Sequence, residues 1–228
     1  MRGVVNKPNL RILELFGFIL LPMFYLCCIG EMGVVLDLDP YLLFTILVAM
    51  LVFSVFEIPV FRVRTRKPNY ARGEAKLLGE LYSVPVEEEL STGDPRVYDT
   101  KVTLNVGGFV LPLLLALYIA RIAPFLETLL IAVIMIASTH FLSKLEGGVG
   151  IIVPSYISLI SIPFAFILAP GSVASIILVG GVLGILIGMM TLLYPIEEGS
   201  AFLNLGGVGS FESMYVTVLL AVVLSFFT

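Results

Sequence analysis

Seven long apolar stretches constrain the fold of this chain more than any other feature of its sequence. They lie at residues 12–36, 41–61, 104–120, 124–143, 149–169, 172–194 and 208–227. A helix needs roughly 20 apolar residues to cross ~30 Å of hydrocarbon, which is close to the length of each stretch. Hydrophobic residues make up 59% of the chain and charged residues 13%, which a soluble domain does not tolerate. The sequence therefore predicts an all-α integral membrane protein with about seven transmembrane helices.

The basic residues predict the orientation of these helices. Arg2, Lys7 and Arg11 precede the first stretch, and eight further bases lie between residues 62 and 101. Basic residues gather on the cytoplasmic side of a membrane protein. With seven spans, twelve of the thirteen bases are cytoplasmic and only Arg121 is outside. We therefore expect a multi-pass protein of the cell membrane with a cytoplasmic N-terminus and an external C-terminus.

One polar section, residues 62–103, interrupts the apolar pattern. It is too short for an independent domain, so we interpret residues 1–228 as a single membrane domain with a cytoplasmic insertion. Residues 80–86 and 96–104 are rich in residues that favour strands, and residues 91–95 between them have the composition of a turn. The section is therefore expected to form a small β-hairpin between the second and third helices.

Several classes of function lack their sequence signature. The chain contains no Walker-type phosphate loop, no Cys/His ligand spacing and no G-x-S-x-G elbow, and its two cysteines, Cys27 and Cys28, are adjacent within the first apolar stretch. We therefore predict no metal and no cofactor. The acidic residues lie mostly in loops and do not indicate a nucleic-acid partner, so membrane lipid is the partner that the composition implies.

Two short segments open with nearly the same residues. Asn105-Val-Gly-Gly and Asn204-Leu-Gly-Gly each lead toward an apolar stretch, and Glu146-Gly-Gly gives a third glycine pair, followed by Pro154. Paired glycine-interrupted segments are typical of broken helices around a polar binding site. An asparagine at such a position also suits a helix N-cap, so capping is the alternative interpretation.

Polar residues at membrane depth are the candidates for a substrate or ion site, because each is costly there unless it is paired or hydrated. Glu212 follows three glycines and a serine at the start of the last stretch. It is either a cavity carboxylate that binds a proton or cation, or a helix-start acid stabilised by the helix dipole. The candidate binding residues are Asn105, Asn204, Glu212, Ser155 and Thr217.

Two further residues are candidates for a proton relay. His140 is the single histidine of the chain and stands near the end of the fourth stretch. Glu57 stands near the end of the second, at about headgroup depth. For both residues a structural role competes with the relay: a hydrogen bond between helices for the histidine, and a position at the interface for the glutamate.

Four glycine-rich segments resemble a prokaryotic membrane family described as domain of unknown function 1614. They are Asn105–Pro112, Gly148–Pro154, Gly181–Gly188 and Gly206–Glu212 with the following Val216-Thr217. The resemblance extends from about residue 50 over most of the remaining chain. It implies a helical membrane fold and brings no established activity.

The same family pattern invites comparison with presenilin-like intramembrane aspartyl proteases, which need two carboxylates that share a proton. An acid often follows the span-6 glycine in the family, where this chain has Met190, and the acid of the last span is Glu212. Ser210 follows the Gly207-Val-Gly209 element where the protease has aspartate. The resemblance therefore implies a relative of that fold without the two-aspartate pair.

Three functions remain open on the sequence. The first is binding or transport of a small solute, ion or proton at a site of glycine-broken helices. The second is an intramembrane peptidase-like protein that pairs Glu212 with an acid such as Glu57 or Glu146. The third is a membrane scaffold whose cytoplasmic hairpin recruits a partner. We expect the first, without catalysis.

Overall fold

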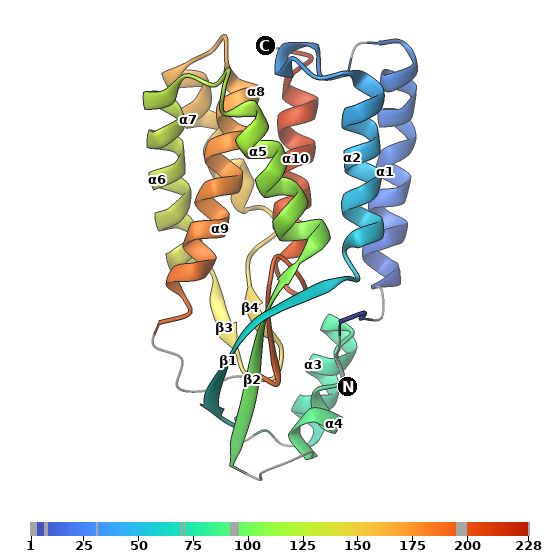
Figure 1. Cartoon of the computed structure of the whole chain (residues 1–228), viewed down its shortest axis with the longest axis vertical. Helices are drawn as coiled ribbons and strands as arrows, with labels where there is room; N and C mark the ends of the chain where they lie inside the picture. Colours follow the sequence, from blue (N-terminus) through green and yellow to red (C-terminus); the bar gives the residue numbers. More distant parts are fainter. Residues whose placement is uncertain are drawn as a thin grey trace.

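The computed structural model describes residues 4–6, 9–30, 32–68, 70, 72–91, 96–194 and 200–227. A bundle of apolar helices stands on a smaller part made of a β-sheet and two short helices (Figure 1). The bundle comprises α1 (Leu10–Cys28), α2 (Pro40–Phe53), α5 (Leu111–Ile119), α6 (Phe125–Leu142), α7 (Ser161–Leu168), α8 (Val173–Ile176), α9 (Val182–Thr191) and α10 (Phe211–Leu224).

Several helices begin at N-cap residues. The Asn9 side chain caps α1 by accepting from the Ile12 amide, and the Asp39 side chain caps α2 by accepting from two amides. Pro40 then occupies the first position of α2, where its missing N–H costs no hydrogen bond. Short 3₁₀ turns, η1 (Val34–Leu36) and η3 (Ile157–Ile160), lead into later helices.

Two helices contain a π-helical turn, which is wider than an α-helical one. The turn η2 (Val106–Val110) precedes α5, and η4 (Ile177–Gly181) joins α8 to α9. Each turn includes a glycine pair, Gly107-Gly108 in η2 and Gly180-Gly181 in η4. Such turns are frequent at functional sites. The glycine pairs therefore mark real irregularities in the helices.

Three helices of the described chain are long and apolar enough to cross a membrane: α1, α6 and the continuous helix Val173–Thr191. Shorter apolar helices cover Pro40–Phe53, Val106–Ile119, Ile157–Leu168 and Phe211–Leu224. Each predicted apolar stretch thus holds an apolar helix, and the three long ones indicate a membrane protein. The count of seven spans stays a prediction, because four of the helices are shorter than a typical span.

The continuous helix Val173–Thr191 is the centre of the bundle. Within its most apolar window 83% is buried, against 17% for α1. It packs on α6 through glycines, because a Cβ at Gly184 would clash with the Met135 side chain and one at Gly188 with Thr139. Small residues allow such close approach of helices in a membrane, where no hydrophobic effect drives their association.

A three-stranded sheet lies beneath the bundle. The strand β1 (Glu57–Arg66) pairs antiparallel with β2 (Val97–Asn105), and β2 pairs in parallel with β5 (Phe202–Leu205). Two shorter strands, β3 (Lys144–Glu146) and β4 (Gly150–Ile152), form a separate hairpin. The register sets Glu57 opposite Asn105 and Thr103 opposite Asn204.

The predicted hairpin is right in its second strand, because residues 96–104 nearly coincide with β2, and wrong in its first. Residues 80–82 end α3 (Arg72–Tyr82), and residue 86 begins α4 (Val86–Ser91). The partner of β2 is β1, which the sequence assigned partly to the second span. Ala75, Leu78 and Tyr82 recur at helical spacing and pack in one small cluster, whereas the pairing of β1 with β2 joins distant segments. The chain is mostly helical but not all-α. Of the predicted turn, residues 92–95 lie outside the described residues.

The described ends of the chain lie at opposite ends of the bundle (Figure 1). Near the N-terminus, the amide of Glu57 donates to the Val4 carbonyl at 2.8 Å, so this segment lies beside the start of β1. The helix α10 runs from that level to the other end. Arg2 and Lys7, on which part of the predicted orientation depends, lie outside the described residues.

Candidate functional site

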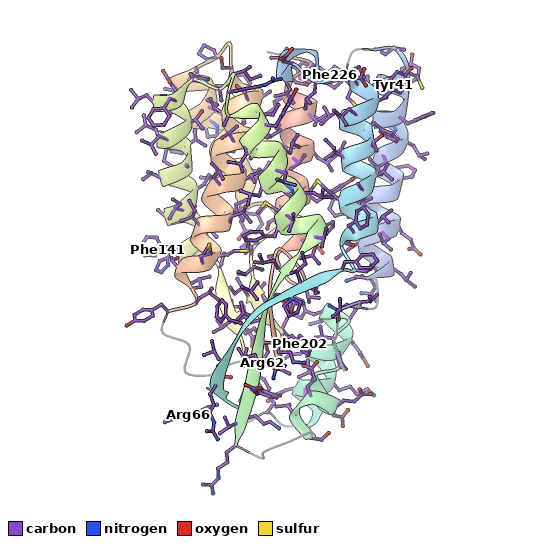
Figure 2. The ribbon with its side chains drawn as sticks, in the orientation of Figure 1. Tyr41, Arg62, Arg66, Phe141, Phe202 and Phe226 are labelled. Carbon is purple, nitrogen blue, oxygen red and sulfur yellow. The ribbon has the colours of Figure 1, made fainter. Side chains whose placement is uncertain are left out.

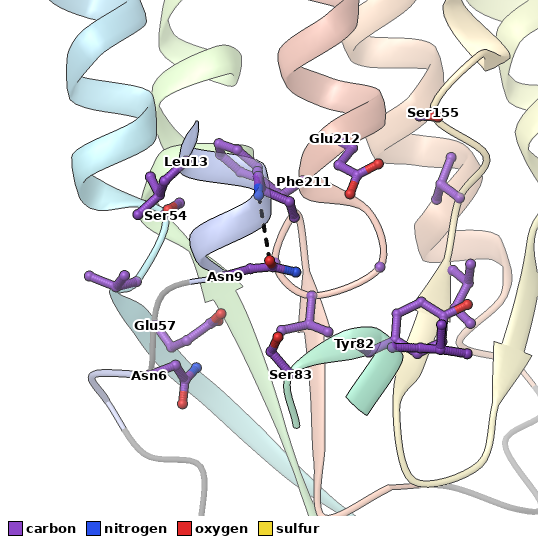
Figure 3. A pocket seen from close by; sticks show the side chains of 18 of the residues that line it. Asn6, Asn9, Leu13, Ser54, Glu57, Tyr82, Ser83, Ser155, Phe211 and Glu212 are labelled. Atoms are coloured by element: carbon purple, nitrogen blue, oxygen red, sulfur yellow. Dashed lines mark hydrogen bonds between the residues drawn. The ribbon is translucent and has the colours of Figure 1, made fainter. Parts of the chain in front are cut away.

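A cavity of about 290 Å³ opens where α1, α3, the start of α10 and the sheet meet. It lies at the lower end of the bundle, and Figure 3 shows side chains from these elements pointing into it. The apolar part of its wall includes Leu13, Val153 and Phe211. The described polar side chains of its wall are Asn6, Asn9, Ser54, Glu57, Tyr82, Ser83, Ser155 and Glu212.

The carboxylate of Glu57 is held by three side chains in the floor of this cavity. Its Oε1 accepts from Asn105 Nδ2 at 3.0 Å and from Asn204 Nδ2 at 3.1 Å. Its Oε2 accepts from Thr103 Oγ1 at 2.8 Å. The residue is 2% exposed. Hydrogen bonds to both oxygens offset the cost of burying a charged group, so Glu57 has a fixed position.

The repeated Asn-x-Gly-Gly segments meet at this carboxylate. Asn105 ends β2 and Asn204 lies in the neighbouring parallel strand β5, so their amides reach the same oxygen. Asn105 also donates to the Ser54 carbonyl at 2.6 Å, and its Oδ1 accepts from the Gly108 amide at 2.8 Å. Asn105 therefore caps the helix, as one interpretation of the sequence expects, and also binds Glu57. A ligand-binding role for these segments stays a prediction.

The glycines behind each asparagine allow the two segments to touch. A Cβ on Gly108 would overlap the carbonyl of Gly206, and one on Gly207 would stand 2.6 Å from Glu57 Oε1. Gly206 has φ +75°, which only glycine adopts readily. The backbone contact between the segments is thus what brings the asparagines within reach of Glu57.

Glu212 enters the same cavity from above. It stands in the first turn of α10, and Figure 3 shows it on the upper side of the cavity, with Glu57 on the lower side. The residue is exposed, and among the described residues its carboxylate has no hydrogen bond or ion pair. Beside it, the Phe211 ring stacks on Tyr215 with ring centroids 5.6 Å apart. Glu212 is therefore fixed by its helix while its charge faces the cavity.

The other residues singled out in the sequence lie in different surroundings. Ser155 lines the cavity, whereas Thr217 is buried in α10 and donates to the Ser213 carbonyl at 2.7 Å. His140 is exposed on α6, with its Nδ1 2.8 Å from Thr191 Oγ1. Glu146 pairs with Lys144 at 2.9 Å in the β3–β4 hairpin and is not part of the cavity wall.

Sequence reasoning did not single out Thr103, Asn9 or Ser83. Thr103 stands two residues before Asn105 in β2, so the two side chains share a face of the strand. Asn9 precedes an apolar helix, which is a recognisable capping signal. Ser83 directly follows α3 with φ +56° and lines the cavity, and this position has no signal in the sequence.

The described residues contain no group of three or more His, Cys, Asp or Glu side chains that could hold a metal ion.

A family model described as "Protein of unknown function (DUF1614)" matches residues 51–224. The chain belongs to this family. No curated protein and no solved structure matches the chain. The DUF1614 match includes Glu57, Asn105, Asn204 and Glu212, whereas α1 lies before it. The likeness to presenilin-like proteases stays a prediction.

Proposed function

We propose that this membrane protein binds a small organic cation in the cavity between Glu57 and Glu212 and moves it across the membrane. The supporting observation is the unpaired Glu212 carboxylate at a cavity whose opposite wall carries a second carboxylate. A carboxylate attracts a cation strongly where the walls have a low dielectric constant. A volume of about 290 Å³ suits a solute of a few heavy atoms.

The remaining wall supports a solute that is partly apolar. Leu13, Val153 and Phe211 offer apolar surface, while Asn9, Ser83 and Ser155 offer hydrogen-bonding groups. A protonated alkylamine combines a charged end with an apolar chain. The absence of a cluster of three or more ligating side chains in the described residues favours such a solute over a multivalent metal ion.

Glu57 and Glu212 are expected to act differently on this solute. Both oxygens of Glu57 already accept hydrogen bonds, so this residue contributes a fixed negative field. Glu212 is the group that contacts the ammonium directly. Proton binding to Glu212 would release the cation and so couple its movement to a proton gradient.

Calorimetry on the chain in lipid nanodiscs tests this proposal. Propylammonium, 1-butanol and butyrate have similar length and differ in charge, and we expect only propylammonium to bind. Glu212→Gln should weaken its binding about tenfold, because the variant loses the ionic contact while keeping the shape. Glu127→Gln is the matched control, since Glu127 is a first-turn acid of α6 that does not line the cavity. Equal loss in both variants would contradict the proposal.

The peptidase-like alternative keeps one favourable observation, because Glu57 and Glu212 line the same cavity. Two acids that share a water molecule can divide the acid and base roles. Cleavage of a fluorogenic transmembrane peptide in proteoliposomes, lost in both Glu57→Gln and Glu212→Gln, would favour it. The scaffold alternative loses its motivating element, since residues 80–86 are not a strand.

A further inference from the structure

The strand β1 exposes apolar side chains outside the helical bundle. Ile58, Val60 and Phe61 are 47%, 55% and 48% exposed. They follow one another closely on the strand that forms the edge of the sheet. A group of large apolar side chains on a surface usually marks a contact with lipid or with another molecule.

The position of this apolar group fits the boundary of a membrane. The helix α2 ends at Phe53, and β1 then crosses beneath the bundle at a steep angle to the helices (Figure 1). Phe53 and Phe56 join the two elements, with ring centroids 5.7 Å apart and both rings partly exposed. The exposed apolar surface thus continues from α2 onto the first half of β1, at the level where the helices end.

The second half of β1 is basic. Arg62, Arg64 and Arg66 alternate along the strand and therefore share one face of the sheet, to which β2 adds Lys101 and Asp99. Figure 2 labels Arg62 and Arg66 on β1. Asp99 lies 3.4 Å from Arg62, with the two side chains 69% and 65% exposed. Such a surface pair is weak, so this face of β1 and β2 keeps an excess of positive charge.

We propose that β1 lies on the membrane surface and binds the headgroups of anionic phospholipids through Arg62, Arg64 and Arg66. The order of its side chains, apolar and then basic, repeats the order of hydrocarbon and phosphate in a leaflet. The arginine fork binds phosphate with two parallel hydrogen bonds. This inference depends on the membrane assignment and not on the proposed cation site.

The bound lipid would contact the same strand that positions Glu57. Glu57 is the first residue of β1, and the register of β1 against β2 sets it opposite Asn105. A headgroup bound to the arginines holds the outer edge of the sheet against the membrane. The lipid therefore supports the strand that carries the buried carboxylate.

A single tryptophan tests the proposal, because the chain contains none. The Phe61→Trp variant is placed in nanodiscs of phosphatidylcholine and phosphatidylglycerol in which one lipid or the other is brominated. Brominated phosphatidylglycerol should quench the fluorescence at least about twofold more strongly than brominated phosphatidylcholine at equal content, because each nearby base enriches anionic lipid. The matched control is Phe141→Trp, an 80% exposed position on α6, where the two lipids should quench alike.

Replacement of the arginines separates the two parts of the proposal. The Phe61→Trp variant is combined with Arg62→Gln, Arg64→Gln and Arg66→Gln. This replacement should remove the preference for phosphatidylglycerol, while both brominated lipids still quench the tryptophan to the same extent. Equal quenching by both lipids before this replacement would overturn headgroup recognition. Absence of quenching at position 61, with normal quenching at position 141, would overturn the membrane-surface position of β1.

Discussion

Replacement of Gly108 by alanine is expected to prevent the chain from reaching its native fold. A methyl group there would overlap the Gly206 carbonyl and stand 2.9 Å from Phe211 Cδ2. Both segments are anchored, one in the helix after β2 and the other between β5 and α10, so neither backbone can retreat without breaking the sheet. We expect a loss of more than about 4 kcal/mol in the free energy of unfolding, which few single substitutions reach.

Thermal unfolding in detergent measures this loss, together with the yield of folded protein. Gly17→Ala is the matched control, because no atom lies within 4 Å of a Cβ at that position of α1. Alanine in a helix is intrinsically favoured over glycine, so the control should be neutral or slightly stabilising. A Gly108→Ala protein as stable as the control would show that the two glycine segments do not touch.

The second large effect is expected from Asn105→Asp. The substituted side chain still accepts from the Gly108 amide, but it loses the donors to Glu57 and to the Ser54 carbonyl. A second carboxylate would then stand about where an amide nitrogen now lies 3.0 Å from Glu57 Oε1. Buried like charges that are not compensated destabilise by roughly 3–5 kcal/mol, so we expect a loss of this order near neutral pH.

The pH dependence of stability distinguishes this repulsion from general damage. A proton shared between the two carboxyl groups restores one hydrogen bond, so the Asn105→Asp protein should recover stability at pH 5 relative to pH 8. Asp39→Asn is the control, because it also exchanges a carboxylate and an amide, but at an exposed helix cap. It should change the free energy of unfolding by less than about 0.5 kcal/mol. A pH-independent loss would argue against direct contact between residues 57 and 105.

The candidate site was partly visible in the sequence. The Asn-x-Gly-Gly segments were predicted to be irregular helix starts near a polar site, and the structure brings them into contact at Gly108 and Gly206. The sequence did not reveal that both amides bind Glu57, since these contacts join residues 48 and 147 positions apart. Glu57 therefore looked like a residue of the headgroup region, whereas its partners bury it.

The sheet was the part of the fold that the sequence concealed. The exposed residues Ile58, Val60 and Phe61 continue the apolar composition of α2 with few interruptions, so composition alone cannot separate the helix from the strand. The strand β5 has four residues and is recognisable only through its pairing with β2. Apolar runs identify membrane helices by length, but strand pairing is a long-range property.

Chemical labelling at position 212 tests most directly whether Glu212 faces a water-filled cavity that opens at the sheet end of the bundle. The Glu212→Cys variant, with Cys27→Ala and Cys28→Ala, is reconstituted into vesicles and treated with a membrane-impermeant methanethiosulfonate from one side or the other. We predict modification only from the side on which the sheet lies. No reaction from either side, or reaction from the opposite side alone, would contradict a cavity at this place.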